Sequence, residues 1–209
     1  MKNINALLYF ICLVCMNHVS IAQESVNTLD DGSTNFLERH PIYDYSEVQL
    51  NHTDTIPGFD SKQEKLKISG TIFKSDGITP AADVILFIEQ ADENGDFDLR
   101  EQDGKRYVYN RGWVKTDANG HYTFYTYIPG NDRRYSQLQQ LYPSIKEASK
   151  PEYDIASFLF DEDPLLSKLC RKRLAKKGDP SRVLKPKKVD GLLVVQKDII
   201  LGSDVNTTK

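Results

Sequence analysis

The sequence predicts an all-β protein, an antiparallel β-sandwich with one short helix in its C-terminal half. Two observations lead to this prediction. Short apolar stretches recur between turn residues from Lys65 to Leu201, as in proteins built from two packed sheets. The one stretch with clear helical spacing comes late, after Asp163. Many strands followed by one helix favour a sandwich over a parallel α/β fold.

The first two predicted strands differ in pattern. From Leu66 to Ile72 apolar and polar residues alternate, which predicts a strand with one buried face. Val84 to Ile88 is a continuous apolar run, typical of a strand buried on both faces. Asp76-Gly77 and Thr79-Pro80 predict the turn between them.

The next two predicted strands run from Tyr107 to Lys115 and from His121 to Ile128, and both are rich in aromatic and β-branched residues. The loop from Thr116 to Gly120 joins them. It has Asp117 early and Gly120 late, as a type I turn followed by a left-handed residue requires. The pattern therefore predicts a hairpin.

The last predicted elements close the sandwich. Weaker strand patterns cover Leu141 to Lys146 and Ile155 to Phe160, and Val189 to Leu201 predicts a short hairpin or a bent strand. Between them we expect a helix that is capped by Asp163, carries Pro164 in its first turn and ends at Gly178.

The N-terminus has the pattern of a secretory signal peptide. Lys2 gives a positive start, Ala6 to Met16 is apolar, and Ser20 to Ala22 supplies small residues for cleavage. The apolar run is too short to remain as a transmembrane helix. We therefore expect export to the periplasm or the cell exterior, with no integral membrane segment after cleavage.

The sequence is divided into four parts by this reasoning: a signal peptide over residues 1–22, an extended polar leader over 23–64, the sandwich over 65–202 and a tail over 203–209. After cleavage Cys170 is the one remaining cysteine, so packing must stabilise the exported chain without an internal disulfide. The net charge of −3 gives no reason to expect nucleic acid as a partner. Nothing in the sequence indicates the oligomeric state.

Several motifs follow one another in the order known from one enzyme family. They are Ala91-Asp92-x-x-Gly95, Arg111-Gly112-Trp113-Val114-Lys115-Thr116-Asp117, Asn119-Gly120-x-Tyr122-x-Phe124, Pro129-Gly130, Asp163-Pro164-Leu165-Leu166 and Asp198-Ile199-Ile200-Leu201-Gly202. From Lys65 to Gly202 the chain resembles the intradiol ring-cleavage dioxygenases, the family of catechol and protocatechuate dioxygenases, and most closely its small secreted members. The resemblance implies a β-sandwich of the intradiol dioxygenase type. It also implies Fe(III) held by two tyrosinates and two histidines.

The positions that match the family's four iron ligands carry other residues in this chain. The first tyrosine position, two residues after Gly95, is Phe97, and the second, two residues after Gly130, is Asp132. Counting on without a gap places the two histidine positions at Gln140 and Tyr142. Ferric iron is a hard cation that anionic oxygen ligands stabilise, and Phe97 has no oxygen. We therefore expect no Fe(III), no other cofactor and no catalytic residues.

Two routes to a rebuilt site remain open. Tyr135 could substitute for the tyrosine that Asp132 replaces, and Asp132, Gln140 and Tyr142 could form a weak oxygen-rich site for a hard metal. The histidines of the chain are poorer candidates for ligands of a rebuilt metal site. His40 and His52 lie in the predicted leader and we do not expect them to fold over the site, and His121 is expected to face solvent at the start of a strand. The family's arginine position falls on Gln137.

The sequence thus predicts an exported pseudoenzyme, a non-catalytic binding or scaffold module that uses the old pocket side of the sandwich. The ligand is not indicated. One alternative is an active ring-cleavage dioxygenase with an atypical metal site. Another is a transthyretin-like or carbohydrate-binding β-sandwich, because Thr-Asp-x-x-Gly-x-Tyr hairpins such as Thr116 to Tyr122 recur in such domains.

Overall fold

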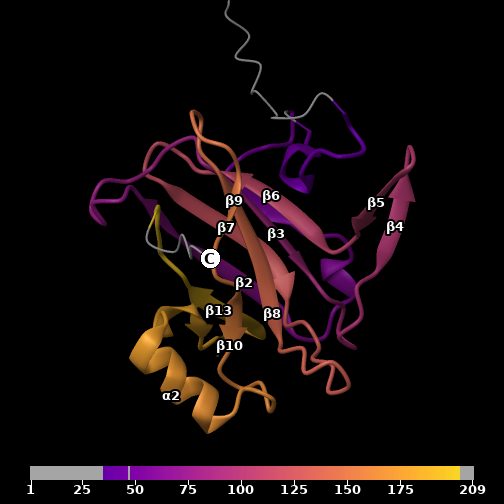
Figure 1. The fold of residues 1–209 in the computed structure, drawn as a ribbon, viewed down its shortest axis with the longest axis vertical. Coiled ribbons are helices and arrows are strands. Elements are labelled where there is room, and N and C mark those ends of the chain that lie inside the picture. Colours follow the sequence, from indigo (N-terminus) through magenta and orange to yellow (C-terminus); the bar gives the residue numbers. More distant parts are fainter. Residues whose placement is uncertain (1–34, 47, 203–209) are drawn as a thin grey trace, which may run out of the picture. The chain divides into compact units, whose positions relative to one another are not determined.

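The computed structural model describes residues 35–46 and 48–202, and within these ranges the chain is mostly β structure with one α-helix (Figure 1). The predicted signal peptide (1–22), the first part of the predicted leader and the predicted tail (203–209) lie outside the described residues. No helix in the described ranges has the length and apolar character needed to cross a membrane.

The described secondary structure consists of fourteen short strands, three 3₁₀ turns and helix α2. The 3₁₀ turns are η1 (Pro41–Tyr43), η2 (Phe59–Ser61) and η3 (Pro180–Arg182), and α2 spans Lys168–Lys177. The strands are β1 (Thr53–Thr55), β2 (Lys65–Phe73), β3 (Ile85–Gln90), β4 (Leu99–Gln102), β5 (Lys105–Val108), β6 (Arg111–Lys115), β7 (His121–Tyr127), β8 (Gln140–Lys146), β9 (Tyr153–Asp154), β10 (Phe158–Phe160), β11 (Val183–Leu184), β12 (Lys187–Val189), β13 (Leu192–Gln196) and β14 (Ile199–Ile200).

Two six-stranded sheets form the body of the structure. The first has the order β1-β7-β2-β13-β12, with β14 also paired to β2, and the second has the order β11-β10-β8-β3-β6, with β9 also paired to β8. Strands β4 and β5 form a separate ribbon, which stands apart on the right of Figure 1. The predicted closing segment is both a hairpin and a bent strand, since β12 pairs with β13 and β14 continues along β2.

The core lies between the two sheets, which confirms the predicted sandwich. It is lined by alternate residues of the central strands, as the period of two requires. The first sheet contributes Leu66, Ile68, Tyr122 and Phe124, and the second contributes Leu86, Ile88, Val114, Leu141, Ile145, Phe158 and Phe160. Most pairs are antiparallel, but the sheets are mixed, because β1–β7, β2–β13, β2–β14 and β10–β11 pair in parallel.

The hairpin predicted at Thr116–Gly120 is wrong, although its turn forms as expected. The Asp117 carboxylate accepts hydrogen bonds from the backbone N–H groups of Asn119 and His121, each at 2.9 Å, and Gly120 is left-handed with φ +72°. The chain nevertheless crosses from one sheet to the other here, since β6 pairs with β3 and β7 pairs with β2. The turn residues fix the local geometry but not the partner of each strand. The predicted strand from Tyr107 to Lys115 is also divided, into β5 and β6.

The predicted leader belongs to the packed structure from Ile42 onward. Ile42 and Ile56 are 0 % and 1 % exposed, and β1 pairs in parallel with β7. The carboxylate of Asp54 accepts a hydrogen bond from the backbone N–H of Trp113 at 2.8 Å. The packed structure therefore begins well before Lys65, the boundary that the sequence suggested. A few isolated apolar residues anchor this segment, and they leave no periodic pattern to detect.

Helix α2 ends where the sequence predicts but begins later. Its cap is Ser167, whose hydroxyl accepts a hydrogen bond from the N–H of Cys170 at 3.2 Å. Asp163, the predicted cap, is 2 % exposed. Its carboxylate accepts a hydrogen bond from the backbone N–H of Leu165 at 2.9 Å, but α2 does not begin there, and it also accepts from the backbone N–H of Gln139 and the side chain of Asn131. Asp163 therefore ties two loops together instead of starting the helix. In Figure 1, α2 lies at the lower left, near β10.

Candidate functional site

The outer face of the second sheet carries the two positions that match the family's histidines. On β8, Leu141 and Ile145 point into the core. Side chains alternate along a strand, so Gln140 and Tyr142 point away from the core. On the neighbouring strand β3, Glu89 is paired directly with Tyr142, and it shares this outer face.

Gln140 and Tyr142 are hydrogen-bonded to each other. The amide nitrogen of Gln140 donates to the phenol oxygen of Tyr142 at 2.6 Å, and its amide oxygen accepts from the hydroxyl of Ser157 at 2.8 Å. The ring of Phe97 lies 5.8 Å from the ring of Tyr142, centroid to centroid. Three of the four ligand positions therefore meet on this face, where their side chains interact with one another.

Asp132, the fourth position, is held by its own loop. Its carboxylate accepts hydrogen bonds from the backbone N–H of Arg134 at 2.8 Å and from the Arg134 guanidinium at 2.9 and 3.2 Å. These bonds lower the pKa of Asp132. Gln137, at the family's arginine position, exchanges backbone hydrogen bonds with Asp132 and donates from its side chain to the carbonyl of Gly95 at 2.9 Å. The carboxylate is thus already neutralised by an arginine.

The donors at these positions do not fit a ferric ion. Burial raises the pKa of the Tyr142 phenol, opposed by the hydrogen bond from Gln140, so this oxygen favours its protonated form over the phenolate that Fe(III) requires. Tyr135, the suggested substitute, is 80 % exposed and lies against Arg134. Among the described residues, no three His, Cys, Asp or Glu side chains are grouped in a way that could hold a metal.

His40 does fold over the outer face, and the expectation that it would not is wrong. Its Nδ1 accepts a hydrogen bond from the backbone N–H of Ile42 at 3.1 Å, and its ring meets Phe87 edge-on at 6.1 Å. Its Nε2 lies 3.9 Å from the carboxylate of Asp154. His121, by contrast, is exposed beside Asp117, as predicted.

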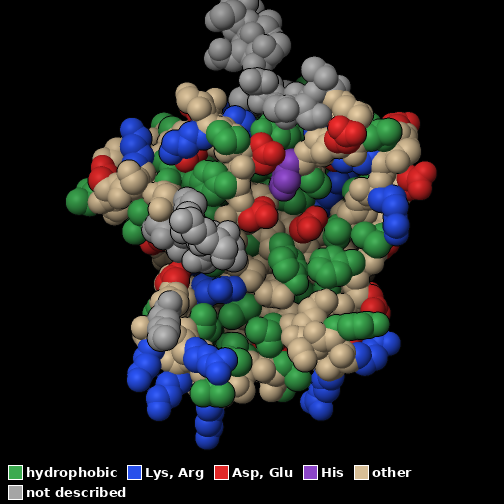
Figure 2. Space-filling model, viewed as in Figure 1, with side chains coloured by type: hydrophobic (Ala, Val, Ile, Leu, Met, Phe, Trp, Pro, Cys, Tyr) green, Lys and Arg blue, Asp and Glu red, His purple; other side chains and the backbone are tan. Residues whose placement is uncertain are grey.

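A cavity of about 230 Å³ lies beneath His40, and we call it the outer-face pocket. Strands β3, β8 and β9 provide its floor and walls, and the residues before η1 cover one side. On the face seen in Figure 2, carboxylates gather around a histidine over β9 and β3, with hydrophobic side chains beside them. The lining residues are His40, Pro41, Phe87, Glu89, Tyr142, Pro143, Ser144, Asp154 and Ile155.

Glu89 is the half-buried acid of this pocket. Its carboxylate forms no hydrogen bond or ion pair with another described residue, and burial raises its pKa above the ordinary value of 4.5. Arg111, its neighbour on β6, opposes that shift, and Asp154 adds to it. The guanidinium of Arg111 lies 3.5 Å from the carboxylate of Asp44 and stacks on Tyr107. Glu89 therefore carries an incompletely compensated charge.

No protein-family model and no curated protein matches this chain. Solved structures do resemble it. The dioxygenase domain of a dioxygenase–carbohydrate-binding protein fusion from the cellulolytic bacterium Streptomyces sp. SirexAA-E is 19 % identical, with a TM-score of 0.54 over 75 % of this chain and 92 % of that domain. An intradiol ring-cleavage dioxygenase from Tetranychus urticae is 15 % identical, with a TM-score of 0.54 over 75 % of this chain and 89 % of that protein.

A third similar structure is the 3-chlorocatechol 1,2-dioxygenase of Rhodococcus opacus 1CP, 18 % identical with a TM-score of 0.53 over 71 % of this chain and 64 % of the enzyme. The chain has the intradiol dioxygenase-like fold. These neighbours favour that fold over the transthyretin-like and carbohydrate-binding alternatives. At such low identity the intradiol dioxygenase-like fold alone is shown, and the chemistry depends on the residues of this chain.

Within this intradiol-like fold, the sequence pointed to Phe97, Gln140 and Tyr142. It placed His40 away from the site and gave no indication of Glu89 or Asp154. Glu89 follows directly after the apolar run of β3, and a charge at the end of a buried strand was the one available signal. The register that pairs it with Tyr142 could not be read from the sequence. Asp154 comes from β9, which has only two residues.

We expect Glu89→Gln to stabilise the protein at neutral pH by about 0.5 kcal/mol. Because folding raises the pKa of Glu89, ionised Glu89 lowers stability above pH 4.5, and the penalty grows as the pH rises through the folded-state pKa. Below pH 4.5 the carboxyl is protonated in both states and the gain should vanish. Urea unfolding of both proteins between pH 4 and 8 measures this difference, and a gain that is independent of pH would contradict it.

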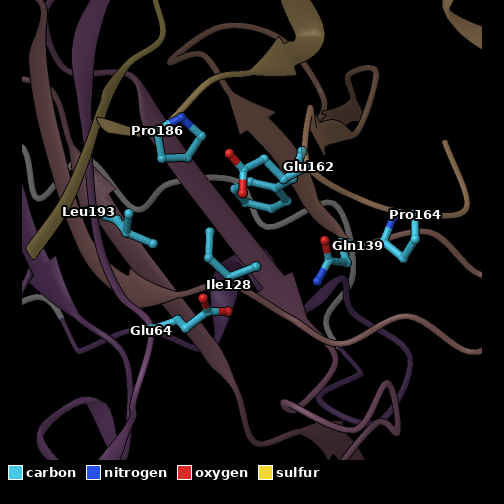
Figure 3. A pocket seen from close by; sticks show the side chains of 8 residues that line it. Glu64, Ile128, Gln139, Glu162, Pro164, Pro186 and Leu193 are labelled. Atoms are coloured by element: carbon cyan, nitrogen blue, oxygen red, sulfur yellow. The ribbon is translucent and has the colours of Figure 1, made fainter. Parts of the chain in front are cut away.

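A second cavity, of about 280 Å³, lies at the end of the sandwich near β7, β10 and β13. Figure 3 shows the carboxylates of Glu64 and Glu162 on either side of Ile128, with Leu193 and Pro186 nearby. Both glutamates are exposed, so water solvates them. None of the four ligand positions lines this cavity, and it serves below as the comparison for the outer-face pocket.

Proposed function

We propose that this chain is an exported binding protein on the intradiol dioxygenase-like fold that does not cleave catechols with Fe(III). One observation carries the proposal: each group at the four ligand positions already interacts with a protein neighbour or has no donor atom. Gln140 and Tyr142 bond to each other, Asp132 bonds to Arg134, and Phe97 packs on Tyr142.

The energetic argument concerns what iron would have to displace. Binding Fe(III) would break the Asp132–Arg134 pair, separate Gln140 from Tyr142 and ionise a phenol whose pKa burial raises. Each step costs free energy, and a neutral amide returns little to a hard cation. The residues therefore favour a protein whose outer face binds a ligand without a metal.

Export rests on the sequence of the N-terminus. The positive start at Lys2, the apolar run from Ala6 to Met16 and the small residues before Gln23 support it. N-terminal sequencing of the exported protein checks this part, and Gln23 is the first residue expected. An intact Met1 on the exported protein would contradict it.

Oxygen uptake with catechol tests the non-catalytic assignment. We expect the full-length protein, incubated with ferric citrate, to consume oxygen no faster than ferric citrate alone. The alternative, an active enzyme with an atypical site, predicts catechol-dependent uptake that Tyr142→Phe and Asp132→Asn abolish. That result would overturn the proposal.

A further inference from the structure

The outer-face pocket has an excess of negative charge. Glu89 and Asp154 line it, and no lysine or arginine of the described part of the chain does. The Nδ1 of His40 accepts a hydrogen bond from the backbone N–H of Ile42, so this nitrogen has a protein partner and does not face Glu89 as a donor. The guanidinium of Arg111, the cross-strand neighbour of Glu89, is shared with Asp44. A bound cation would supply the positive partner that the Glu89 carboxylate lacks.

The walls of the pocket suit an apolar or aromatic body. Phe87 is 1 % exposed and forms part of the wall together with Tyr142 and Pro143. Aromatic faces attract ammonium groups and also pack against apolar groups. Asp154, with its side chain 80 % exposed, stands at the rim, and one of its oxygens accepts from Ser144 at 2.6 Å.

The geometry of Gln140 leaves one donor at this site. Because Gln140 donates to the phenol oxygen of Tyr142, the phenol hydrogen of Tyr142 points elsewhere, and no hydrogen bond from it to a described residue is formed. The cavity of about 230 Å³ is smaller than the usual range for drug-sized ligands, about 300–1,000 Å³. The occupant must therefore be small.

We infer that the outer-face pocket binds a small organic cation, a primary ammonium on an apolar or aromatic body, with Glu89 as the main acceptor and Asp154 as the rim acceptor. A metal ion fits less well, because the described His, Asp and Glu side chains are not grouped for one. A neutral polyol would leave Glu89 uncompensated. The inference rests on the proposed function, since it names the class of ligand for the same face.

Three probes of similar shape and different charge test this inference: benzylamine, benzyl alcohol and benzoate. Titration of the full-length protein by isothermal calorimetry should show saturable benzylamine binding at millimolar concentration, about tenfold tighter than benzyl alcohol. Benzoate should not bind. Equal affinity for benzylamine and benzyl alcohol, or no saturable binding of benzylamine, would overturn the inference.

Variants place the binding in this pocket. Glu89→Gln, which should not weaken the fold, is expected to reduce benzylamine affinity about tenfold. Asp154→Asn, at the exposed rim, should reduce it about threefold. Glu162→Gln, the matched control in the second cavity, should leave it unchanged. Loss of binding in Glu162→Gln but not in Glu89→Gln would move the site to the second cavity and refute the inference.

The two proposals fail separately. Catechol-dependent oxygen uptake would refute the non-catalytic assignment and leave a benzylamine result in the Glu89 pocket standing. An absent benzylamine signal would refute the cation pocket and leave the oxygen-uptake result unaffected.

Discussion

Asp44→Asn should lower the free energy of unfolding by about 3 kcal/mol. The Asp44 side chain is 8 % exposed and lies 3.0 Å from Arg39 Nε, 2.8 Å from Lys105 Nζ and 3.5 Å from Arg111 Nη1. Lys105 is itself only 7 % exposed. Removing this carboxylate takes away the ion-pair partner that the structure gives the buried Lys105 ammonium, which costs far more than losing a surface ion pair.

Urea unfolding at pH 7 measures this loss, with Asp60→Asn as the control because Asp60 is exposed. The control should change stability by no more than about 0.5 kcal/mol. Asp44 also anchors the segment that places His40 over β3 and β8, so Asp44→Asn should weaken benzylamine binding as well. An Asp44→Asn protein as stable as the control would show that the leader segment is not held by this cluster.

Gly130→Ala should destabilise the protein by about 3 kcal/mol. A Cβ at Gly130 would overlap the backbone of Glu93 and Gly95 and would lie 2.7 Å from the carbonyl carbon of Asn94. The loop with Asp92 and Gly95 and the loop with Gly130 and Asn131 cannot easily move apart. The N–H of Gly130 donates to the carbonyl of Asp92 at 2.7 Å, and a Cβ at Gly95 would lie 2.6 Å from the carbonyl oxygen of Asn131.

Gly191→Ala is the matched control for Gly130→Ala. Gly191 has φ +86° but no atom within 4 Å of an added Cβ, so the substitution should cost only about 1 kcal/mol of backbone strain. Urea unfolding measures both variants. Equal losses in the free energy of unfolding would show that the close approach of the two loops does not contribute to stability. These loops lead to Phe97 and Asp132. Their contact therefore holds the backbone at two of the family's ligand positions, although the residues at those positions have changed.

A strand could be predicted from the sequence wherever its own residues carry a clear pattern of apolar and polar side chains. The alternation in β2 and the apolar run in β3 identified both strands and their buried faces. Pairing could not be predicted in the same way, because the Thr116–Gly120 turn is equally compatible with a hairpin and with a crossing between sheets. Asp163 shows a similar limit: its sequence context suits a helix cap, but its tertiary partners Gln139 and Asn131 determine its role.

The candidate site was only partly visible in the sequence. Counting along the sequence without a gap pointed to Gln140 and Tyr142. In the structure these two residues are hydrogen-bonded to each other, and the ring of Phe97 lies beside Tyr142. Glu89 and His40 join them through strand register and through the fold of the N-terminal segment. Such long-range contacts come from residues far apart in the chain, and no local pattern encodes them.

The most direct test of the loss of the iron site is the iron content and visible spectrum of the purified full-length protein after incubation with ferric citrate and removal of free metal. Iron bound by tyrosinate gives a visible charge-transfer band, and the side chains of Phe97, Asp132, Gln140 and Tyr142 do not fit such a complex. We predict far less than one iron per chain and no visible band. About one iron per chain together with that band would show that the chain retains a ferric site.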